Sequence, residues 1–294
     1  EGNKMNKIVG KVIRTVGYFI GFSVLLYPSV SNYLNQIHGT AVVSDYQQQV
    51  SHTTEEEENR MFAEAQAYNQ RLLGSISLED PFEAGIKQEN TEYESLLNMG
   101  GNGVMGYVEI PKIKVLLPIY HGTSEAVLQS GIGHLEQTSL PVGGESTHAV
   151  ISGHRGLPSA RLFTDLDQIE NGDVFYIKVL NRTLAYQVDQ ILTVLPTETQ
   201  ALAITEGADQ VTMVTCTPYA INTHRLLVRG SRIPYEEAVE VAEELEIKPQ
   251  VPLTQKMLML GVGAILLVWL VVTAIRIVRW VKERKKAKEN GHEE

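Results

Sequence analysis

Two long apolar runs frame this chain. The second, Met257 to Ile275, is nineteen residues without a charge, and as a helix rising about 1.5 Å per residue it spans about 28 Å, close to the thickness of a bilayer core. The pattern therefore predicts a transmembrane helix over residues 257–278. The first run, Thr15 to Val30, is shorter and contains Pro28. It predicts a transmembrane signal anchor over residues 15–33, and a cleaved signal peptide is the alternative.

Basic residues lie on the outer flank of each apolar run. They are Lys4, Lys7, Lys11 and Arg14 before the first run, and Arg276, Arg279, Lys282, Arg284, Lys285, Lys286 and Lys288 after the second. Positively charged flanks stay on the cytoplasmic side of a membrane. We therefore expect a multi-pass protein of the cell membrane whose tails, residues 1–14 and 279–294, are both cytoplasmic. The segment between the runs is then extracellular, whether the first run remains as an anchor or is cleaved as a signal peptide.

The first part of this extracellular segment, residues 34–103, carries one clear helical pattern. Thr53 and Thr54 precede four glutamates, an arrangement typical of a capped helix start. Apolar residues then recur at helical spacing, namely Met61, Phe62, Ala65, Tyr68, Leu72 and Leu73. We predict an amphipathic helix of about 20 residues that ends at Gly74. From residue 75 to 103 no period is sustained, so we expect an irregular connection.

From Tyr107 onward the pattern changes to short β-type segments separated by turn residues. The predicted strands are Gly106 to Ile110, Val115 to Tyr120, Thr147 to Ser152, Val174 to Leu180, Thr183 to Leu195, Gln210 to Cys216 and His224 to Arg232. Short helical interruptions are predicted at Glu125 to Ser130, Ser159 to Leu166 and Thr199 to Ile204. About eight short strands within roughly 130 residues favour a mainly β fold, a closed barrel or a sandwich, over a parallel sheet.

Charge and cysteine usage narrow the range of functions. The formal charge is −10, yet residues 31–255, between the two apolar runs, hold 13 Lys or Arg against 30 Asp or Glu. Such an acidic surface repels nucleic acid, so we expect no nucleic-acid partner. The single cysteine, Cys216, has no second thiol with which to form an internal disulfide. No spacing typical of a zinc site or a phosphate loop occurs, so we expect neither a metal nor a cofactor.

Cys216 closes an apolar, β-branched run at a predicted strand end. A thiol in this position serves as a nucleophile when a proton carrier and a positive charge lie near it. His154, in a glycine-flanked turn after another strand, is the candidate proton carrier, and Arg225 is the candidate cation. His224 competes with His154. A small buried hydrophobic residue is the alternative role for a lone cysteine.

These residues resemble the motifs of one enzyme family. The run from Thr212 to Cys216, TMVTC, resembles the TLxTC signature of sortases with Met213 in place of Leu, and its continuation to Leu226 is similar to class C sortases. Gly153 to Arg155 resembles the histidine turn of the family, and Leu166 to Asp173 resembles its hairpin entry. The exchange of Leu for Met keeps volume and polarity, so it leaves the resemblance intact.

The resemblance implies a sortase-type β-barrel over residues 104–236 and the activity of a cysteine transpeptidase. In that scheme the Cys216 thiolate attacks the carbonyl between Thr and Gly of an LPxTG-like sorting signal and forms a thioacyl enzyme. His154 protonates the departing amine, and Arg225 binds the signal or the developing oxyanion. A pilin lysine then accepts the acyl group. Pilin subunits are therefore the implied partners, and a covalent pilus is the implied product.

The resemblance also gives a meaning to Asp80, Pro81 and Phe82 within the irregular connection. In class C sortases an Asp-Pro-aromatic motif belongs to a lid over the active site, where the Asp meets the catalytic Arg and the ring lies over the Cys. We therefore expect Asp80 beside Arg225 and Phe82 over Cys216, so that the lid must open before substrate enters. An ordinary turn is the alternative, because Asp-Pro is frequent in loops.

Two other functions are compatible with parts of this pattern. A housekeeping sortase that attaches proteins to a cell-wall precursor would be expected to lack both the second span and the Asp80 to Phe82 motif. A non-enzymatic membrane tether would carry Cys216 as an inert buried residue. Residues 237–256 are predicted to link the barrel to the second span.

Overall fold

The computed structural model describes residues 2–72, 80, 82, 90–244, 269 and 273. The chain divides into two units, Glu1–Ile247 and Lys248–Glu294. In the second unit only Trp269 and Thr273 are described, and the Thr273 hydroxyl donates to the Trp269 carbonyl at 2.6 Å. The predicted second span and basic tail otherwise lie outside the described residues, as do Gly74 and Pro81.

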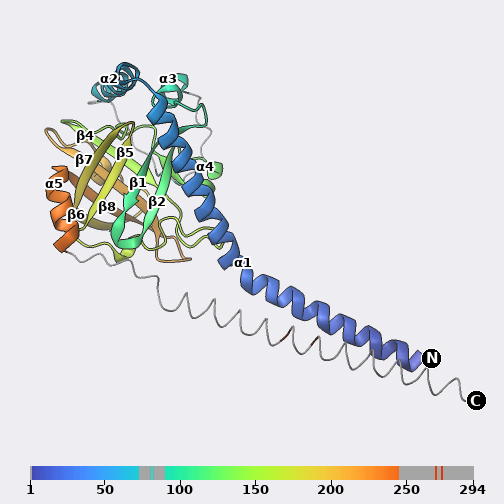
Figure 1. Cartoon of the computed structure of the whole chain (residues 1–294). Coiled ribbons are helices and arrows are strands. Elements are labelled where there is room, and N and C mark those ends of the chain that lie inside the picture. Colours follow the sequence, from blue (N-terminus) through green and yellow to red (C-terminus); the bar gives the residue numbers. More distant parts are fainter. Residues whose placement is uncertain are drawn as a thin grey trace, which may run out of the picture. The chain divides into compact units, whose positions relative to one another are not determined.

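A closed eight-stranded β-barrel forms the body of the first unit (Figure 1). Its strand order is β1-β2-β3-β4-β7-β8-β6-β5. The strands are β1 (Val104–Ile110), β2 (Val115–His121), β3 (Ile132–His134), β4 (Thr147–Ser152), β5 (Val174–Val179), β6 (Arg182–Val194), β7 (Asp209–Thr217) and β8 (His224–Ile233). The pairs β2–β3 and β4–β7 are parallel, and the other neighbours are antiparallel. The prediction of a barrel with about eight strands is confirmed.

The seven predicted strands all form, with ends that shift by at most two residues. The eighth, β3, was not predicted, because three residues are too few to carry a pattern and their pairing with β2 and β4 is what defines the strand. The helix α4 (Glu125–Ser130) forms as predicted, with the Ser124 hydroxyl accepting from the Val127 amide.

The helix predicted over residues 159–166 is wrong. That segment forms turns and ends in the 3-10 helix η2 (Leu166–Gln168). The Phe163 amide donates back to the His154 carbonyl at 3.2 Å, and Leu162 adopts a positive φ of 40°. These contacts close a loop rather than a helical turn. The helix predicted from Thr199 to Ile204 is shorter in the structure, where only the 3-10 helix η3 (Gln200–Leu202) forms.

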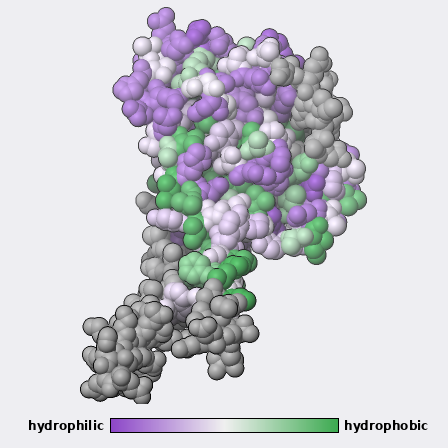
Figure 2. Space-filling model, turned by 90° about the vertical axis from the view of Figure 1, so that its right-hand side faces the viewer, coloured by the Kyte–Doolittle hydropathy of each residue, from purple (hydrophilic) through white to green (hydrophobic). Residues whose placement is uncertain are grey.

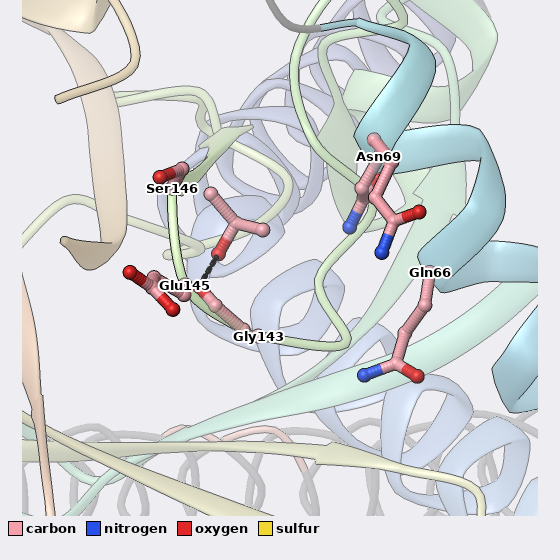
Figure 3. Close-up of a pocket in the computed structure, with 8 residues that line it drawn as sticks. Gln66, Asn69, Gly143, Glu145 and Ser146 are labelled. Atoms are coloured by element: carbon pink, nitrogen blue, oxygen red, sulfur yellow. Dashed lines mark hydrogen bonds between the residues drawn. The ribbon is translucent and has the colours of Figure 1, made fainter. Parts of the chain in front are cut away.

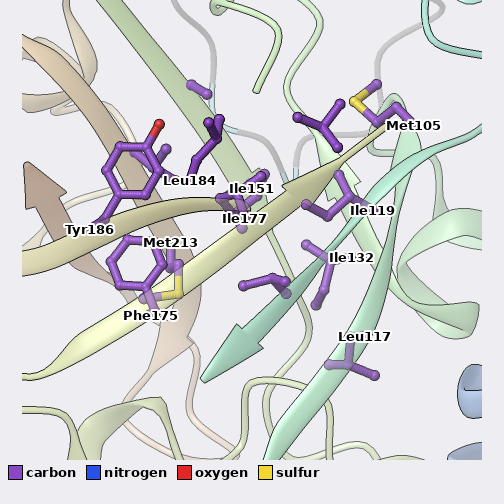
Figure 4. Packing of buried hydrophobic residues seen from close by; sticks show 14 of the residues in the cluster. Met105, Leu117, Ile119, Ile132, Ile151, Phe175, Ile177, Leu184, Tyr186 and Met213 are labelled. Atoms are coloured by element: carbon purple, nitrogen blue, oxygen red, sulfur yellow. The ribbon is translucent and has the colours of Figure 1, made fainter. Parts of the chain in front are cut away.

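The barrel interior is filled by alternate residues of the strands, as a half-buried strand pattern predicts (Figure 4). Ile151 of β4 lies opposite Met213 of β7 in parallel register, and both are fully buried. Phe175 and Tyr186 stack with ring centroids 5.5 Å apart. Gly230 makes this stack fit, because a Cβ there would lie 2.5 Å from the Phe175 ring.

The helix α1 (Gly2–His52) contains the predicted anchor and continues far beyond it. Residues Ile13–His52 are long and apolar enough to cross a membrane. The far end of the same helix packs on the barrel, where Val43 and Tyr46 are buried against Val104 and Tyr107. The Tyr46 hydroxyl donates to the Met105 carbonyl at 3.1 Å. One helix therefore joins the apolar segment to the barrel.

Two shorter helices lie at the opposite end of the barrel from the anchor (Figure 1). The helix α2 (Glu55–Arg71) begins at the predicted cap, where the Thr54 hydroxyl accepts from the Glu57 amide. Near its end, the Asn69 side chain exchanges two hydrogen bonds with the backbone of Leu140, at 3.0 and 2.7 Å. The helix α3 (Thr91–Ser95) was not predicted. After β8 the chain continues into α5 (Tyr235–Glu244).

Candidate active site

Cys216 lies at the end of β7, directly opposite Arg225 of β8 in the antiparallel register. The cysteine is only 7% exposed. Burial raises the pKa of the Cys216 thiol above its usual value, and the carboxylate of Asp80 raises it further, while Arg225 acts in the opposite direction. The thiol is therefore held in its protonated, less reactive form while the site is covered.

His154 follows β4 in a turn that is bonded to β7 just before the cysteine. The Gly153 amide donates to the Val214 carbonyl at 3.1 Å, and the Thr215 hydroxyl donates to the Gly153 carbonyl at 2.7 Å. Gly153 is required for close packing, because a Cβ there would lie 2.6 Å from the Ile132 side chain. The parallel pairing of β4 and β7 thus brings the ends of the two strands together.

The guanidinium of Arg225 is bound by the carboxylate of Asp80. Arg225 Nε donates to Asp80 Oδ1 at 2.9 Å and Nη2 donates to Oδ2 at 2.5 Å. The two side chains are 12% and 3% exposed, so this two-point ion pair is desolvated. Arg225 Nη1 also donates to the carbonyls of Asn222 and His224, each at 3.2 Å. The predicted approach of Asp80 to Arg225 is present.

Phe82 covers the two candidate partners of the cysteine. Its ring centroid lies 5.6 Å from that of His154 at an angle of 36°, and Arg225 Cζ lies 5.1 Å from the ring centroid. Phe82 also packs on a small apolar cluster that includes Val150, Val214 and Leu227. An aromatic ring on an imidazole and a guanidinium excludes water from both groups.

Glu125 is a neighbour of His154 that the sequence did not reveal. Glu125 Oε2 lies 3.5 Å from His154 Nε2, which is an ion-pair distance without hydrogen-bond geometry, and Nε2 is buried with no hydrogen bond in the described part of the chain. Gln129 Nε2 donates to Glu125 Oε1 at 2.8 Å. A carboxylate at the start of α4 was predictable, but its approach to His154 depends on the β2–β3 pairing that was not.

The other histidines of the barrel have different surroundings. Burial lowers the pKa of His134 to about 3, and its ring bonds to the Tyr93 hydroxyl and the Ser139 carbonyl. His148 bridges the Ala203 carbonyl and the Thr212 hydroxyl. The competing candidate, His224, bonds to the adjacent Thr223 hydroxyl. His154 is thus the histidine that lies against Phe82.

A polar groove of about 500 Å³ lies between α2 and the 143–147 turn (Figure 3). Gly144 at its edge donates its amide to Asp209 at the start of β7, the opposite strand end from Cys216. Asn69 in its wall has both side-chain atoms bonded to Leu140. Among the described residues no group of three His, Cys, Asp or Glu side chains is arranged to hold a metal ion. Glu145, Ser146 and Thr147 line this groove, but no thiol or histidine does, so Cys216 is the candidate centre.

Comparison with known proteins agrees with this geometry. Residues 108–233 match the family described as Sortase domain. The chain is similar to sortase C of Streptococcus pneumoniae, with 48% identity and a TM-score of 0.60 over 66% of this chain and 97% of that one. It is also similar to sortase C1 of Streptococcus agalactiae, with 50% identity and a TM-score of 0.61 over 66% and 98%.

A curated relative covers less of the chain. Sortase A of Streptococcus agalactiae serotype III (strain NEM316) is 29% identical over 168 residues, which are 56% of this chain and 62% of that protein. The chain therefore spans about three fifths of the length of this relative.

Proposed function

The chain belongs to the class C sortases, a family of cysteine transpeptidases, and we propose that it polymerises pilin subunits. In this proposal it cleaves an LPxTG-like sorting signal between Thr and Gly and joins the Thr to a lysine amine of another pilin. The observation that carries the proposal is the pairing of Cys216 with Arg225 across β7 and β8, under a cover made by Asp80 and Phe82. The similar sortase C of Streptococcus pneumoniae is described in terms of pilin substrate specificity.

The proposed reaction has two steps. The Cys216 thiolate adds to the Thr carbonyl, His154 gives a proton to the departing Gly amine, and a thioester to Cys216 remains. The lysine amine then attacks the thioester, His154 takes a proton from it, and an isopeptide bond forms as the thiolate leaves. Arg225 donates to the oxyanion or to the signal, because it is charged throughout and presents several N–H groups.

Asp80, Pro81 and Phe82 act as the lid in this proposal. Asp80 occupies the donors of Arg225, and Phe82 lies on His154. Substrate cannot meet these groups until the segment moves away, so opening precedes acylation. The burial of Cys216 is therefore compatible with catalysis. The contact between Asp80 and Arg225 also favours class C over a housekeeping sortase, which would be expected to lack this motif.

A membrane location accompanies the activity. Residues Ile13–His52 of α1 are long and apolar enough to cross a membrane, and in this proposal they anchor the protein in the cell membrane. We further propose that the barrel is extracellular, that both termini are cytoplasmic, and that residues 257–278 form the second span, because basic residues flank both apolar runs.

Mass spectrometry of the enzyme with an LPxTG-type peptide tests the proposal. We expect a thioacyl adduct on Cys216, and none in Cys216→Ala. A non-enzymatic tether would form no adduct even when Phe82→Ala uncovers the site. Transfer of the acyl group to a pilin lysine, rather than to a cell-wall precursor, separates the class C function from the housekeeping one.

A further inference from the structure

We propose that the β7–β8 turn, residues 218–223, lies in the membrane interface, with Tyr219 and Ile221 in contact with lipid. The active site would then operate at the surface of the bilayer. This inference goes beyond the proposed reaction, because it concerns where the barrel sits and which surface it presents to the membrane.

The composition and exposure of α1 indicate where the bilayer ends along the helix. No Asp, Glu, Lys or Arg occurs between Arg14 and Asp45, and large apolar side chains stay exposed as far as Ile37. From Arg14 to Asn32 an α-helix rises about 27 Å, close to the thickness of a bilayer core. Asn32 therefore falls at the outer boundary of the hydrocarbon. Tyr33 beside it is 58% exposed, and tyrosine is enriched at such boundaries.

A chain of contacts links Asn32 to the active site. Asn32 Oδ1 accepts a hydrogen bond from the Arg161 amide at 2.9 Å. Arg161 belongs to the loop that starts at His154, and this loop meets the β7–β8 turn at Gly156, where an added Cβ would lie 3.1 Å from the Tyr219 ring. The turn beside Cys216 is thus two contacts away from the helix residue at the membrane boundary.

The strand register independently indicates which end of the barrel faces the membrane. Tyr46 lies 14 residues beyond Asn32, about 21 Å further along α1 from the membrane, and its hydroxyl accepts from the Leu180 amide at the β5–β6 turn at 2.8 Å. From that turn β6 runs back through about 40 Å of extended chain to Val194, which pairs with Arg225. The end of the barrel that holds Arg225 and Cys216 therefore faces the membrane.

The surface of that end suits a lipid interface. Tyr219 is 55% exposed and Ile221 is 66% exposed, and no Asp or Glu occurs from Thr217 to His224. A tyrosine and an isoleucine exposed together are costly in water and favourable at a bilayer boundary. Figure 2 shows hydrophilic residues gathered at the end away from the anchor and more apolar residues toward it.

This placement defines how substrate arrives. A polypeptide whose own apolar segment is still inserted in the bilayer presents the residues next to that segment at headgroup level. Cys216 would meet such residues without the substrate leaving the membrane. The partner of the turn is therefore the lipid interface itself, and the bilayer also delivers membrane-anchored polypeptides to the site.

Spin labels in the full chain test the placement. The single cysteine is first replaced, as Cys216→Ala, and one cysteine is introduced at a time in nanodiscs of phosphatidylcholine and phosphatidylglycerol. Labels at I221C, in the turn, and P158C, in the loop that carries Arg161, are both at exposed positions and should be several-fold more accessible to oxygen than to a water-soluble nickel chelate. A label at E206C, exposed before the start of β7, should show the reverse.

The outcomes separate the possibilities. Equal accessibility at positions 221 and 206 would overturn the proposal. A label at L25C, a 79% exposed site on α1, reports on anchoring itself, and exposure of that label to the chelate would overturn the proposal at its first step. Because every variant lacks Cys216, failure here leaves the peptide-adduct test of the proposed function unaffected.

Discussion

Replacement of Asp80 by Asn should open the lid and make Cys216 more reactive. Asn keeps the size of the side chain but removes the charge that binds the Arg225 guanidinium at two points. In the closed state the charged guanidinium would then be buried without its counter-ion, which penalises that state. In the open state water solvates Arg225, so the substitution costs little there.

The size of the effect follows from the two contacts. A hydrogen bond to a charged group contributes about 1.5 to 3 kcal/mol, and the amide oxygen introduced by Asp80→Asn retains part of one. We estimate that the closed state loses about 2 to 3 kcal/mol relative to the open one, which raises the open fraction about 30 to 150-fold. Removal of the Asp80 charge also lowers the pKa of Cys216, since burial and this carboxylate both raise it.

Alkylation of Cys216 by a small thiol reagent measures the open fraction. The rate of labelling, followed by mass spectrometry at several pH values, should rise by one to two orders of magnitude in Asp80→Asn, as the population shift above requires. The pH at which the labelling rate reaches half its maximum should also be lower, because the Cys216 thiol loses both a nearby negative charge and its burial. Asp189→Asn is the matched control, because it removes a more exposed carboxylate that also pairs with an arginine, Arg229.

A labelling rate in Asp80→Asn equal to that of the wild type would refute the reasoning. It would mean that the ion pair does not hold the segment closed. A rise of the same size in Asp189→Asn would equally contradict it, since that residue lies outside the site and a general loosening of the barrel would then be the cause.

The remaining predictions concern catalysis and stability. Arg225→Lys keeps the charge but loses the forked donors, so peptide cleavage should fall at least tenfold while adduct formation stays detectable; cleavage at the wild-type rate would contradict a role in oxyanion binding. Glu125→Gln keeps the shape of the side chain but removes the negative charge 3.5 Å from His154 Nε2, so peptide cleavage should fall several-fold while thiol labelling of Cys216 keeps the wild-type rate; cleavage at the wild-type rate would contradict a role of Glu125 in the reaction. Asn69→Ala breaks two buried hydrogen bonds to Leu140 and should cost about 2 to 3 kcal/mol in urea unfolding, whereas Asn59→Ala, on the surface, should leave the midpoint unchanged.

The strands that the sequence predicts are short apolar or β-branched segments bounded by turn residues. Thr147 to Ser152 is predicted to the residue, although every one of its residues is buried and none alternates with an exposed one. The short elements β3 and α3 depend on tertiary contacts instead. Tyr93 of α3 is fully buried against His134 and His121, and nothing within five residues of sequence specifies that packing.

The residues of the candidate site also divide into those that the local sequence predicts and those that depend on tertiary contacts. Cys216 and Arg225 were candidates from their places at strand ends, and the register confirms that they face each other. The contact of Asp80 with Arg225 joins residues 145 positions apart, so only the resemblance to a family suggested it. Glu125 was missed because its approach to His154 is set by how the chain crosses from β2 to β3, which no local pattern encodes.

Tyr46 determines where the folded domain begins. Its hydroxyl binds the Met105 carbonyl and the Leu180 amide at a buried position, so the strands β1 and β5 are completed by a residue of the anchor helix. A shortened protein of residues 38–244, which lacks both apolar runs, keeps this bridge and should fold as a soluble barrel. One that starts after His52 leaves a buried donor and acceptor unpaired, at a cost of about 1 to 3 kcal/mol for each group. The folding unit and the membrane anchor therefore share one helix, and the boundary between them lies within it.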